Sequence, residues 1–371
     1  ALLPASPRRS PLAVKPTDVR PVAAEVYFLP IRARVPFKFG KEIMTTVTCV
    51  RVRLTVEDRA GKQAEGWGET PLAVQWGWPS SLAYEPRNEG MQQFCLQLAA
   101  SWAALKNTGH ALEVGYDFQE HVLPGLLDTF NRDRGELSMP HLAALICASA
   151  FDIALHDAYG KLHGVDIYAT YNREFMNRDL AHFLEAAEDI PLDYGGRYPQ
   201  DYFVKQPPTR MKAWHLVGGV DALDASDLTG QEPNDGYPVM LSEWLATDGL
   251  SCLKIKLRGN DSAWDYDRVV RVGRIALAHK ADWLTADFNC TVNDPEYVNE
   301  ILDQLRDREP RLYGMMLYVE QPFPYDLEAN RIPAWSVSAR KPLFLDESAH
   351  DWRDLLLDLK RRGLDAPPRL V

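Results

Sequence analysis

The chain has 371 residues, of which 46% are hydrophobic and 25% are charged, and these fractions are typical of a globular protein. Its 41 basic and 52 acidic residues leave a net charge of -11, and no basic block interrupts the acidic excess. Nucleic acids and anionic membranes are therefore poor partners, and an anionic substrate would need a local cation or a metal. A chain of this length exceeds what one core usually organises, so two domains are expected.

Residues 1–24 are rich in proline and are predicted to form a flexible arm. Pro11, Lys15, Pro16 and Asp18 interrupt any apolar run, which argues against a signal peptide. No apolar run approaches the roughly 20 residues that a membrane span needs. The five cysteines are far apart and form no CxxC pair, so a reduced, cytoplasmic protein is expected.

Residues 25–164 are predicted to form a compact α+β unit. Three extended segments come first, over EVYFLPIRARVPFKFG and over an alternating stretch that turns at Ala60-Gly61. The period then becomes helical, and the long apolar run HLAALICASAFDIALHDAYGKLHG is expected to end at Gly164. Residues 165–209 are aromatic, polar and irregular, and they are interpreted as an insertion or linker without an assigned function.

Residues 210–371 are predicted to form a (β/α) barrel domain. Five short apolar runs alternate with helical segments, which indicates parallel strands; the runs are KAWHLVGG, CLKIKLRG, DWLTADFN, YGMMLYVEQP and KPLFLDES. Lys256, Asp287 and Glu320 are separated by 31 and 33 positions, and an eight-fold barrel uses about 31 residues per repeat. The polar residue at the end of each run lies where such barrels build their active sites.

Side chains two apart in a strand share a face, and this rule gathers the polar residues of the barrel. Lys254 and Lys256 share one face of the second run, whereas Leu253, Ile255 and Leu257 share the other. Asp287, Glu320 and Asp346 fall on the corresponding face of the next three runs. Glu347 is assigned to the opposite, helix-facing set, so Asp346 is preferred to it.

Three carboxylates held close together repel one another unless a cation lies among them. Oxygen ligands with room for water and substrate suit Mg²⁺, with Mn²⁺ as a close second. Such an ion stabilises the charge that develops when a carbon next to a carboxylate loses its proton. A lysine could take that proton, and a second lysine would lower its pKa by repulsion. For Lys254 and Lys256 alone, a solvated edge strand remains the ordinary alternative.

The series KIK, DFN, VEQP and LDES, at successive strand ends, resembles the enolase superfamily, and EQP with DES is more similar to its muconate-lactonising branch than to its mandelate racemase branch. The resemblance implies a modified (β/α)7β barrel with an N-terminal α+β capping domain, and a homo-oligomer. It also implies metal ligation by Asp287, Glu320 and Asp346, with Lys256 as the base and Lys254 as its electrostatic partner. Further residues would contact a small carboxylate substrate: Asn289, Ser348, and the lid residues Phe37, Lys38 and Phe39.

The last of the five runs is only the fifth strand of the expected barrel, and the next helix is predicted over 352–363. The barrel domain is therefore expected to be incomplete in this chain. Either the chain is a fragment of a longer protein, which we prefer, or something else closes the barrel. The second acid or base that would separate racemases and epimerases from cycloisomerases and dehydratases is expected on later strands. The product class and the substrate identity stay open at this stage.

Enediolate chemistry in an isomerase or lyase is the leading hypothesis, and three alternatives remain. A relative without catalytic activity could keep the metal site as a small-acid binding module. An acid-sugar dehydratase of the same superfamily would share the metal site and the base. A metal-free glycosidase could use Glu320 and Asp346 as its acid and nucleophile, but it would leave both lysines unexplained.

Overall fold

The computed structural model describes residues 14–39, 41–185, 191–326, 329–330 and 332–348. Contacts divide the chain into two compact units, the first made of Ala1–Ile31 with Val47–Pro208 and the second of Arg32–Thr46 with Thr209–Val371. The first 13 residues of the predicted arm and the helix predicted over 352–363 lie outside the described residues.

A three-stranded sheet with the order β1-β2-β3 forms the frame of the first unit. Its strands are β1 (Val19–Phe39), β2 (Glu42–Asp58) and β3 (Gln63–Pro71), and β2 pairs with β3 in antiparallel register. Alternate residues of β2 are fully buried, which is the period of a sheet with one covered face; they are Val50, Val52, Leu54 and Val56. The ends of β1 and β2 that meet in their hairpin, residues 32–46, belong to the second unit.

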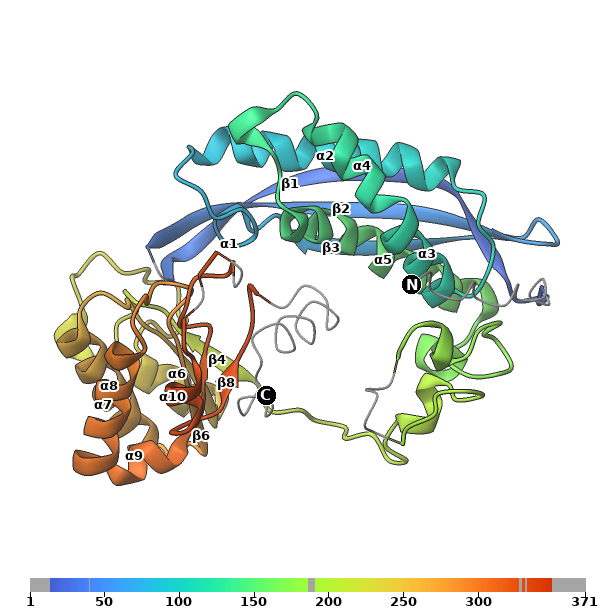
Figure 1. Ribbon diagram of the computed structural model, residues 1–371. Coiled ribbons are helices and arrows are strands. Elements are labelled where there is room, and N and C mark those ends of the chain that lie inside the picture. Colours follow the sequence, from blue (N-terminus) through green and yellow to red (C-terminus); the bar gives the residue numbers. More distant parts are fainter. Residues whose placement is uncertain (1–13, 40, 186–190, 327–328, 331, 349–371) are drawn as a thin grey trace, which may run out of the picture. The chain divides into compact units, whose positions relative to one another are not determined.

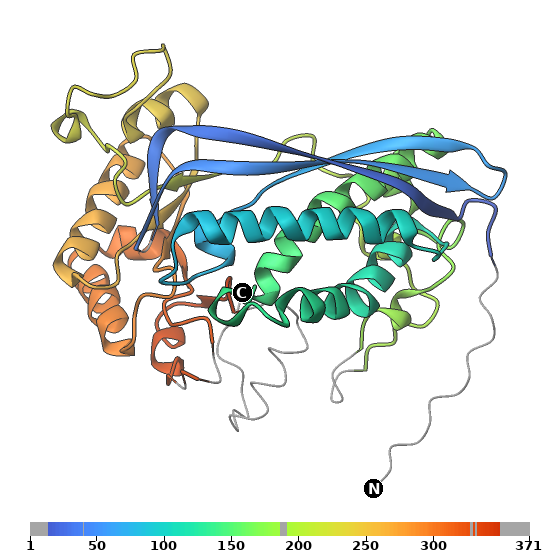
Figure 2. The same ribbon diagram turned by 90° about the horizontal axis from the view of Figure 1, so that it is seen from above.

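Helices cover this sheet (Figures 1 and 2). They are α1 (Val74–Gly77), α2 (Tyr84–Ala104), α3 (Ala111–His121), α4 (Leu123–Asn131), η1 (Gly135–Leu137) and α5 (His141–His163). Helix α5 packs against β3 and α2, and Gly164 ends it in the left-handed conformation, as the sequence predicts. Length and composition alone would let α5 cross a membrane, but its fully buried residues, including Phe151 and Leu155, belong to the core of this unit.

The segment after α5 contains only short 3₁₀ helices among its described residues, η2 (Ile167–Thr170), η3 (Leu180–His182) and η4 (Pro199–Tyr202). Polar contacts attach it to α3. Glu113 accepts hydrogen bonds from the backbone N–H groups of Asn177 and Arg178, both at 2.7 Å. Arg178 also forms a two-pronged ion pair with Asp117, at 2.6 and 2.9 Å.

The second unit contains a parallel sheet with the order β4-β5-β6-β7-β8. The strands are β4 (Trp214–Val217), β5 (Cys252–Lys256), β6 (Trp283–Asp287), β7 (Met316–Glu320) and β8 (Leu343–Phe344). The helical segments are η5 (Ala225–Asp227), α6 (Leu241–Asp248), α7 (Ser262–Ala278), α8 (Pro295–Arg308), α9 (Pro310–Met315) and α10 (Trp335–Ser338). Asp261 and Asp294 cap the first turns of α7 and α8.

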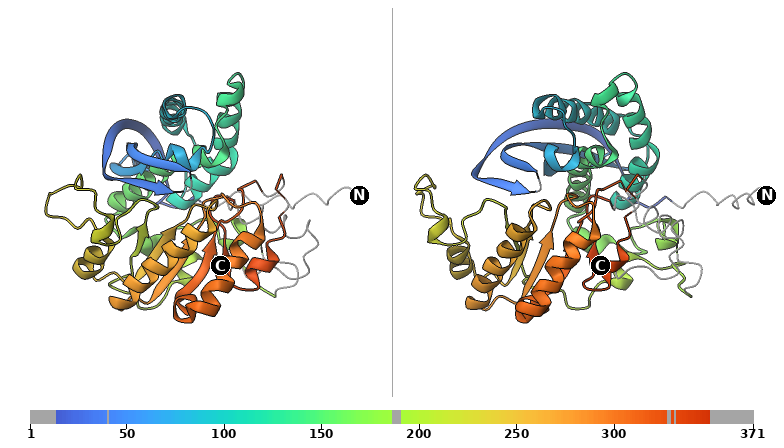
Figure 3. Two further views of the ribbon diagram at one scale, coloured as in Figure 1. Left: turned by 90° about the vertical axis from the view of Figure 1, so that its left-hand side faces the viewer. Right: turned by 60° about the vertical axis from the view of Figure 1, so that its left-hand side comes forward.

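Helices α7 to α9 lie on one face of the parallel strands (Figure 3). Leu253 and Ile255 are fully buried in the core that these helices share with the sheet. Lys254 and Lys256 therefore point from β5 to the opposite face. The predicted fold class is confirmed in its two parts, an N-terminal α+β unit followed by parallel β/α repeats.

Candidate active site

The carboxyl ends of β5, β6 and β7 bring together four of the predicted site residues. In the sheet register Lys256 is opposite Asp287, and Asp287 is opposite Glu320. Lys254 lies one pleat earlier on the same face, opposite Thr285. Parallel pairing therefore places two cations and two acids in neighbouring positions, although the chain separates Lys254 from Glu320 by 66 residues.

Direct ion pairs connect these four side chains. Lys256 Nζ lies 2.5 Å from Asp287 Oδ2, and Lys254 Nζ lies 3.0 Å from the same oxygen. Lys254 Nζ also donates a hydrogen bond to Glu320 Oε1. Asp287 is 0% exposed and Glu320 is 2% exposed, so both carboxylates depend on the lysines instead of water for their compensation.

The carboxylates determine the charge of Lys254. Burial acts to lower its pKa, but Asp287 and Glu320 together outweigh burial and hold the pKa above its usual value. Lys254 therefore stays an ammonium at neutral pH and can supply a fixed positive charge.

Two glutamates of the cluster have pKa values close to neutral pH. Burial raises the pKa of Glu320 to about 7, with repulsion from Asp287 as the next cause. Burial also raises the pKa of Glu347 to about 7, and repulsion from Asp346 and Asp287 adds to it. The cluster therefore holds more acidic groups than its two lysines can neutralise, which is a common property of functional sites.

The end of β8 contributes Asp346, Glu347 and Ser348, but not by strand alternation. The strand stops at Phe344, and the next residues turn. Glu347 is 6% exposed, and its Oε1 lies 3.3 Å from Asn289 Nδ2. It therefore faces the cluster, and the prediction that it faces the helices is wrong. The backbone N–H groups of Asp346 and Ser348 both donate to the side-chain oxygen of Gln321, at 3.0 and 3.3 Å.

Asn289 lies at the centre of these contacts. Its backbone N–H donates to Asp287 Oδ1 at 2.8 Å, and its side-chain amide lies between Asp287 and Glu347. The backbone of Asn289 has a φ of 48°, in the left-handed region that asparagine tolerates better than most residues. The structure thus brings Asn289 to the predicted acids, as its position after β6 suggests.

Several buried oxygen atoms of this cluster lack a hydrogen-bond partner, and these are Thr285 Oγ1, Asn289 Oδ1 and Glu347 Oε2. Buried acceptors without donors, beside crowded carboxylates, suit a hard cation such as Mg²⁺. Within the described residues, no three acidic, histidine or cysteine side chains are already arranged as a metal-binding group. Lys254 is bonded to both Asp287 and Glu320, so a bound cation would have to displace its ammonium.

The three predicted lid residues lie at the hairpin end that belongs to this unit. The backbone oxygen of Lys38 accepts a hydrogen bond from Gly219 N at 2.8 Å. Phe39 is nearly buried, and its ring centroid lies 5.9 Å from Lys256 Nζ. A Cβ atom on Gly218 would lie 3.1 Å from the ring of Phe37, so a glycine permits this close approach. Of the three predicted lid residues, Phe39 is the one whose ring lies near Lys256.

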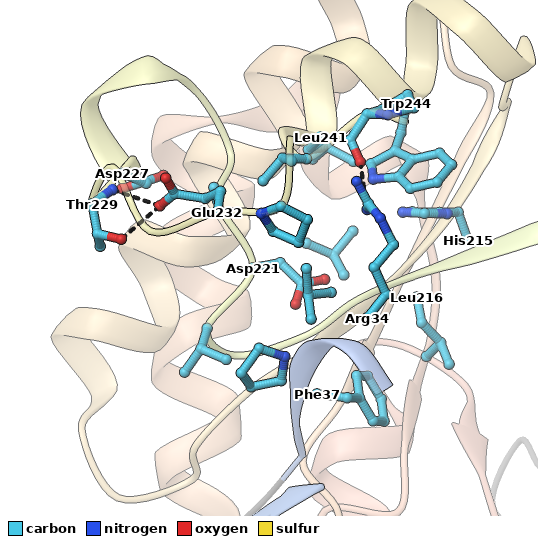
Figure 4. Close-up of a pocket in the computed structure, with 18 of the residues that line it drawn as sticks. Arg34, Phe37, His215, Leu216, Asp221, Asp227, Thr229, Glu232, Leu241 and Trp244 are labelled. Atoms are coloured by element: carbon cyan, nitrogen blue, oxygen red, sulfur yellow. Dashed lines mark hydrogen bonds between the residues drawn. The ribbon is translucent and has the colours of Figure 1, made fainter. Parts of the chain in front are cut away.

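Phe37 instead lines a cavity of about 550 Å³ in the same unit (Figure 4). Its walls come from hairpin residues 34–37, from β4 and from the segments at 220–222, 227–233 and 238–244. Arg34 donates to the backbone oxygen of Pro238 at 2.9 Å, and His215 lies in the wall with Trp244. The cavity shares no lining residue with the carboxylate cluster, so we assign it no part in the chemistry.

Comparisons with known proteins agree with this architecture. Neither a protein-family model nor a curated protein sequence matches the chain. A dipeptide epimerase from Enterococcus faecalis, complexed with Mg and L-Leu-L-Tyr, is 15% identical with a TM-score of 0.55, over 93% of this chain and 72% of the epimerase. Muconate lactonizing enzyme from Pseudomonas fluorescens, complexed with muconolactone, is 16% identical with a TM-score of 0.54, over 93% and 70%.

A third solved structure, N-succinyl Arg/Lys racemase from Bacillus cereus, is 14% identical with a TM-score of 0.53, and the match covers 93% of this chain and 71% of the racemase. At these identities the matches show the fold. The chain therefore has the fold of these three enzymes, as the resemblance of its strand-end motifs implied.

Two residues of the cluster were not selected from the sequence. The alternation rule places Glu347 on the helix-facing side and favours its neighbour Asp346. Gln321 follows Glu320 directly, and the motif VEQP contains it, but no sequence signal indicates the contacts of its amide. Both are revealed only by the way the strand ends meet in space.

Proposed function

We propose that this protein is an enolase-superfamily enzyme that removes the proton alpha to a carboxylate of a small substrate. The observation that carries the proposal is the convergence of Lys254 and Lys256 with Asp287 and Glu320 at neighbouring strand ends. The fold shared with two isomerase-type enzymes and a lactonising enzyme supports the reaction type. The enediolate formed would lead to racemisation, epimerisation, cycloisomerisation or dehydration.

Asp287, Glu320 and Asp346 would hold Mg²⁺, or Mn²⁺, and the buried acceptors around them support an oxygen-ligated ion. The bound ion would neutralise the crowded acids and stabilise negative charge on the substrate carboxylate. The Mg present in the epimerase structure described above is consistent with this ligand chemistry.

The two lysines would divide the work of proton transfer. Lys256 would take the alpha proton at Nζ after its ammonium has left Asp287 and lost its own proton. Lys254, which its acidic neighbours keep charged against the effect of burial, would stabilise the anion that forms. Asn289 and Ser348 would line the substrate position, and Phe39 would exclude water from the side of the hairpin. A homo-oligomeric state and a cytoplasmic location remain predictions.

Exchange of the alpha proton tests this proposal directly. The chain with Mg²⁺ is incubated in deuterated water with dipeptides, N-succinyl amino acids and muconolactone, and ¹H NMR follows loss of the alpha signal. Lys256→Ala should lose exchange, whereas Lys212→Ala, which changes an exposed lysine of the same unit, should keep it. Exchange that survives in Lys256→Ala would remove this lysine from the base role. Calorimetry that finds no Mg²⁺ or Mn²⁺ binding would contradict the proposal independently of the substrate.

A further inference from the structure

Gln321 occupies the position directly after the proposed ligand Glu320, in an unusual conformation. Its side chain is 1% exposed, and its φ of 33° lies in the left-handed region, which residues other than glycine seldom adopt. Such strain persists only where surrounding contacts enforce it, and it gathers at functional sites. The contacts that enforce it here can be followed atom by atom.

The backbone of Gln321 connects three strand ends. Its N–H donates to the backbone oxygen of Phe344 at 2.9 Å, which ties β7 to β8. Its carbonyl accepts from the backbone N–H of Cys290 at 2.8 Å, which ties β7 to the loop after β6. The strained residue therefore joins the ends of β6, β7 and β8, at which the proposed ligands lie.

The side-chain amide of Gln321 uses its full hydrogen-bonding capacity. Its oxygen accepts from the backbone N–H groups of Asp346 and Ser348, at 3.0 and 3.3 Å. Its nitrogen donates to the backbone oxygen of Phe323 at 3.0 Å and to Ser348 Oγ at 2.8 Å. These partners also define which end of the amide is the oxygen, because two N–H groups face one end and a carbonyl faces the other.

We infer that Gln321 is a positioning residue, whose amide holds the turn at Asp346 so that this carboxylate meets the same cation as Asp287 and Glu320. The inference rests on the proposed function. Strand alternation cannot orient Asp346, since β8 ends at Phe344. The hydrogen bonds that the Gln321 side chain accepts from Asp346 and Ser348 take the place of strand pairing at that point. Glutamate lacks the two N–H donors, methionine lacks all four bonds, and asparagine is one methylene too short to reach the same partners.

A double-mutant cycle on metal affinity tests the inference. Mn²⁺ is titrated into the full chain and followed by electron paramagnetic resonance, for the wild type, Gln321→Met, Asp346→Ala and the double variant. Asp346→Ala should weaken Mn²⁺ binding at least about tenfold, and Gln321→Met should weaken it about tenfold. In the Asp346→Ala background, Gln321→Met should add less than about a twofold loss, because the residue it positions is gone.

The possible outcomes separate the inference from the proposed function. Unchanged affinity in Gln321→Met, or an equal loss in both backgrounds, would overturn the positioning role and leave the metal site standing. Unchanged affinity in Asp346→Ala would contradict the proposed ligand set itself. The control Gln231→Met alters an exposed glutamine of the same unit and should bind Mn²⁺ as the wild type does. If Gln321→Met does not fold, the cycle is run with Gln321→Asn, since asparagine tolerates a positive φ.

Discussion

Each of the two units buries acidic side chains, but the two stabilise the buried charge differently. In the first unit Glu113 is 2% exposed, and both of its carboxylate oxygens accept two hydrogen bonds. Three of these four donors are backbone N–H groups, which come from His110, Asn177 and Arg178. In the second unit Asp287 and Glu320 face lysine ammonium groups and one another, and a single backbone N–H, that of Asn289, donates to Asp287.

This difference separates Glu113 from the proposed metal ligands better than burial does. Fixed backbone donors satisfy the carboxylate oxygens of Glu113 and join residues 177 and 178 to α3. At the strand ends, Glu320 and Glu347 have pKa values raised to about 7, and Glu347 Oε2 has no partner. This under-compensation of the acids supports the cation site that we propose.

The sharpest way to test this contrast is Glu320→Gln. The change removes one charge from the crowded cluster and one anionic ligand from the proposed cation. We expect affinity for Mg²⁺ to fall by about a hundredfold or more, measured by titration calorimetry at pH 8. In chelator at pH 8 the free energy of unfolding should not fall, because the neutral amide removes the repulsion from Asp287 and Lys254 keeps Asp287 as a partner. Wild-type Mg²⁺ affinity in this variant would contradict the proposal that Glu320 differs from Glu113 by binding a cation.

Glu113→Gln should show the reverse pattern. An amide has one acceptor oxygen, so its NH₂ group must face donors that the carboxylate accepted, and at least one backbone N–H loses its partner. The free energy of unfolding should fall by about 2–4 kcal/mol, measured by urea denaturation. Mg²⁺ affinity of the folded variant should equal that of the wild type. A stability loss below about 0.5 kcal/mol would show that the Glu113 contacts are not structural.

Much of the fold could be predicted from local patterns, and the exceptions have physical causes. The helical period and Gly164 predict α5 and its end because both signals lie within the helix. The first strand was expected from Glu25 but starts at Val19. Val19 forms a backbone bridge with Gly109, a contact across 90 residues that no local pattern contains. The attachment of residues 177–178 to Glu113 was invisible for the same reason.

The candidate site shows the same limit. Alternation within a strand gathers Lys254, Lys256, Asp287 and Glu320, because parallel register preserves which face each side chain occupies. The rule fails after Phe344, where the strand ends and Glu347 turns to Asn289. The role of Gln321 could not be predicted, since the sequence does not distinguish a buried glutamine with four hydrogen bonds from an exposed glutamine.

The stabilising effect of Mg²⁺ should depend on pH. The folded chain keeps protons on Glu320 and Glu347 up to about pH 7, whereas the unfolded chain loses them near 4.5. In chelator this contribution to the free energy of unfolding therefore decreases as the pH rises through that window. Mg²⁺ binds the ionised acids, so its stabilisation should grow from pH 5.5 to 8, reaching about 2.7 kcal/mol at a hundredfold excess over Kd.

Thermal unfolding with Mg²⁺ and with chelator, at matched pH values, measures this effect. The difference between the two conditions cancels groups whose titration the cation does not change. His110 of the first unit also does not titrate in this pH range, because burial lowers its pKa to about 3. A difference that stays constant from pH 5.5 to 8 would mean that these glutamates do not participate in cation binding.

Glu347→Gln should have the smallest effect, and it tests the claim that this cluster is under-compensated. At pH 8 the wild type bears a buried carboxylate that Asp346 and Asp287 repel, and the neutral amide removes that repulsion. In chelator the variant should therefore be more stable than the wild type, by on the order of 1 kcal/mol. At about pH 3.5, below both the folded and the unfolded pKa, the wild-type side chain is protonated in both states, so the two proteins should unfold alike. A variant that is less stable at both pH values would show that Glu347 is held by donors as firmly as Glu113, and the contrast between the two units would no longer identify the site.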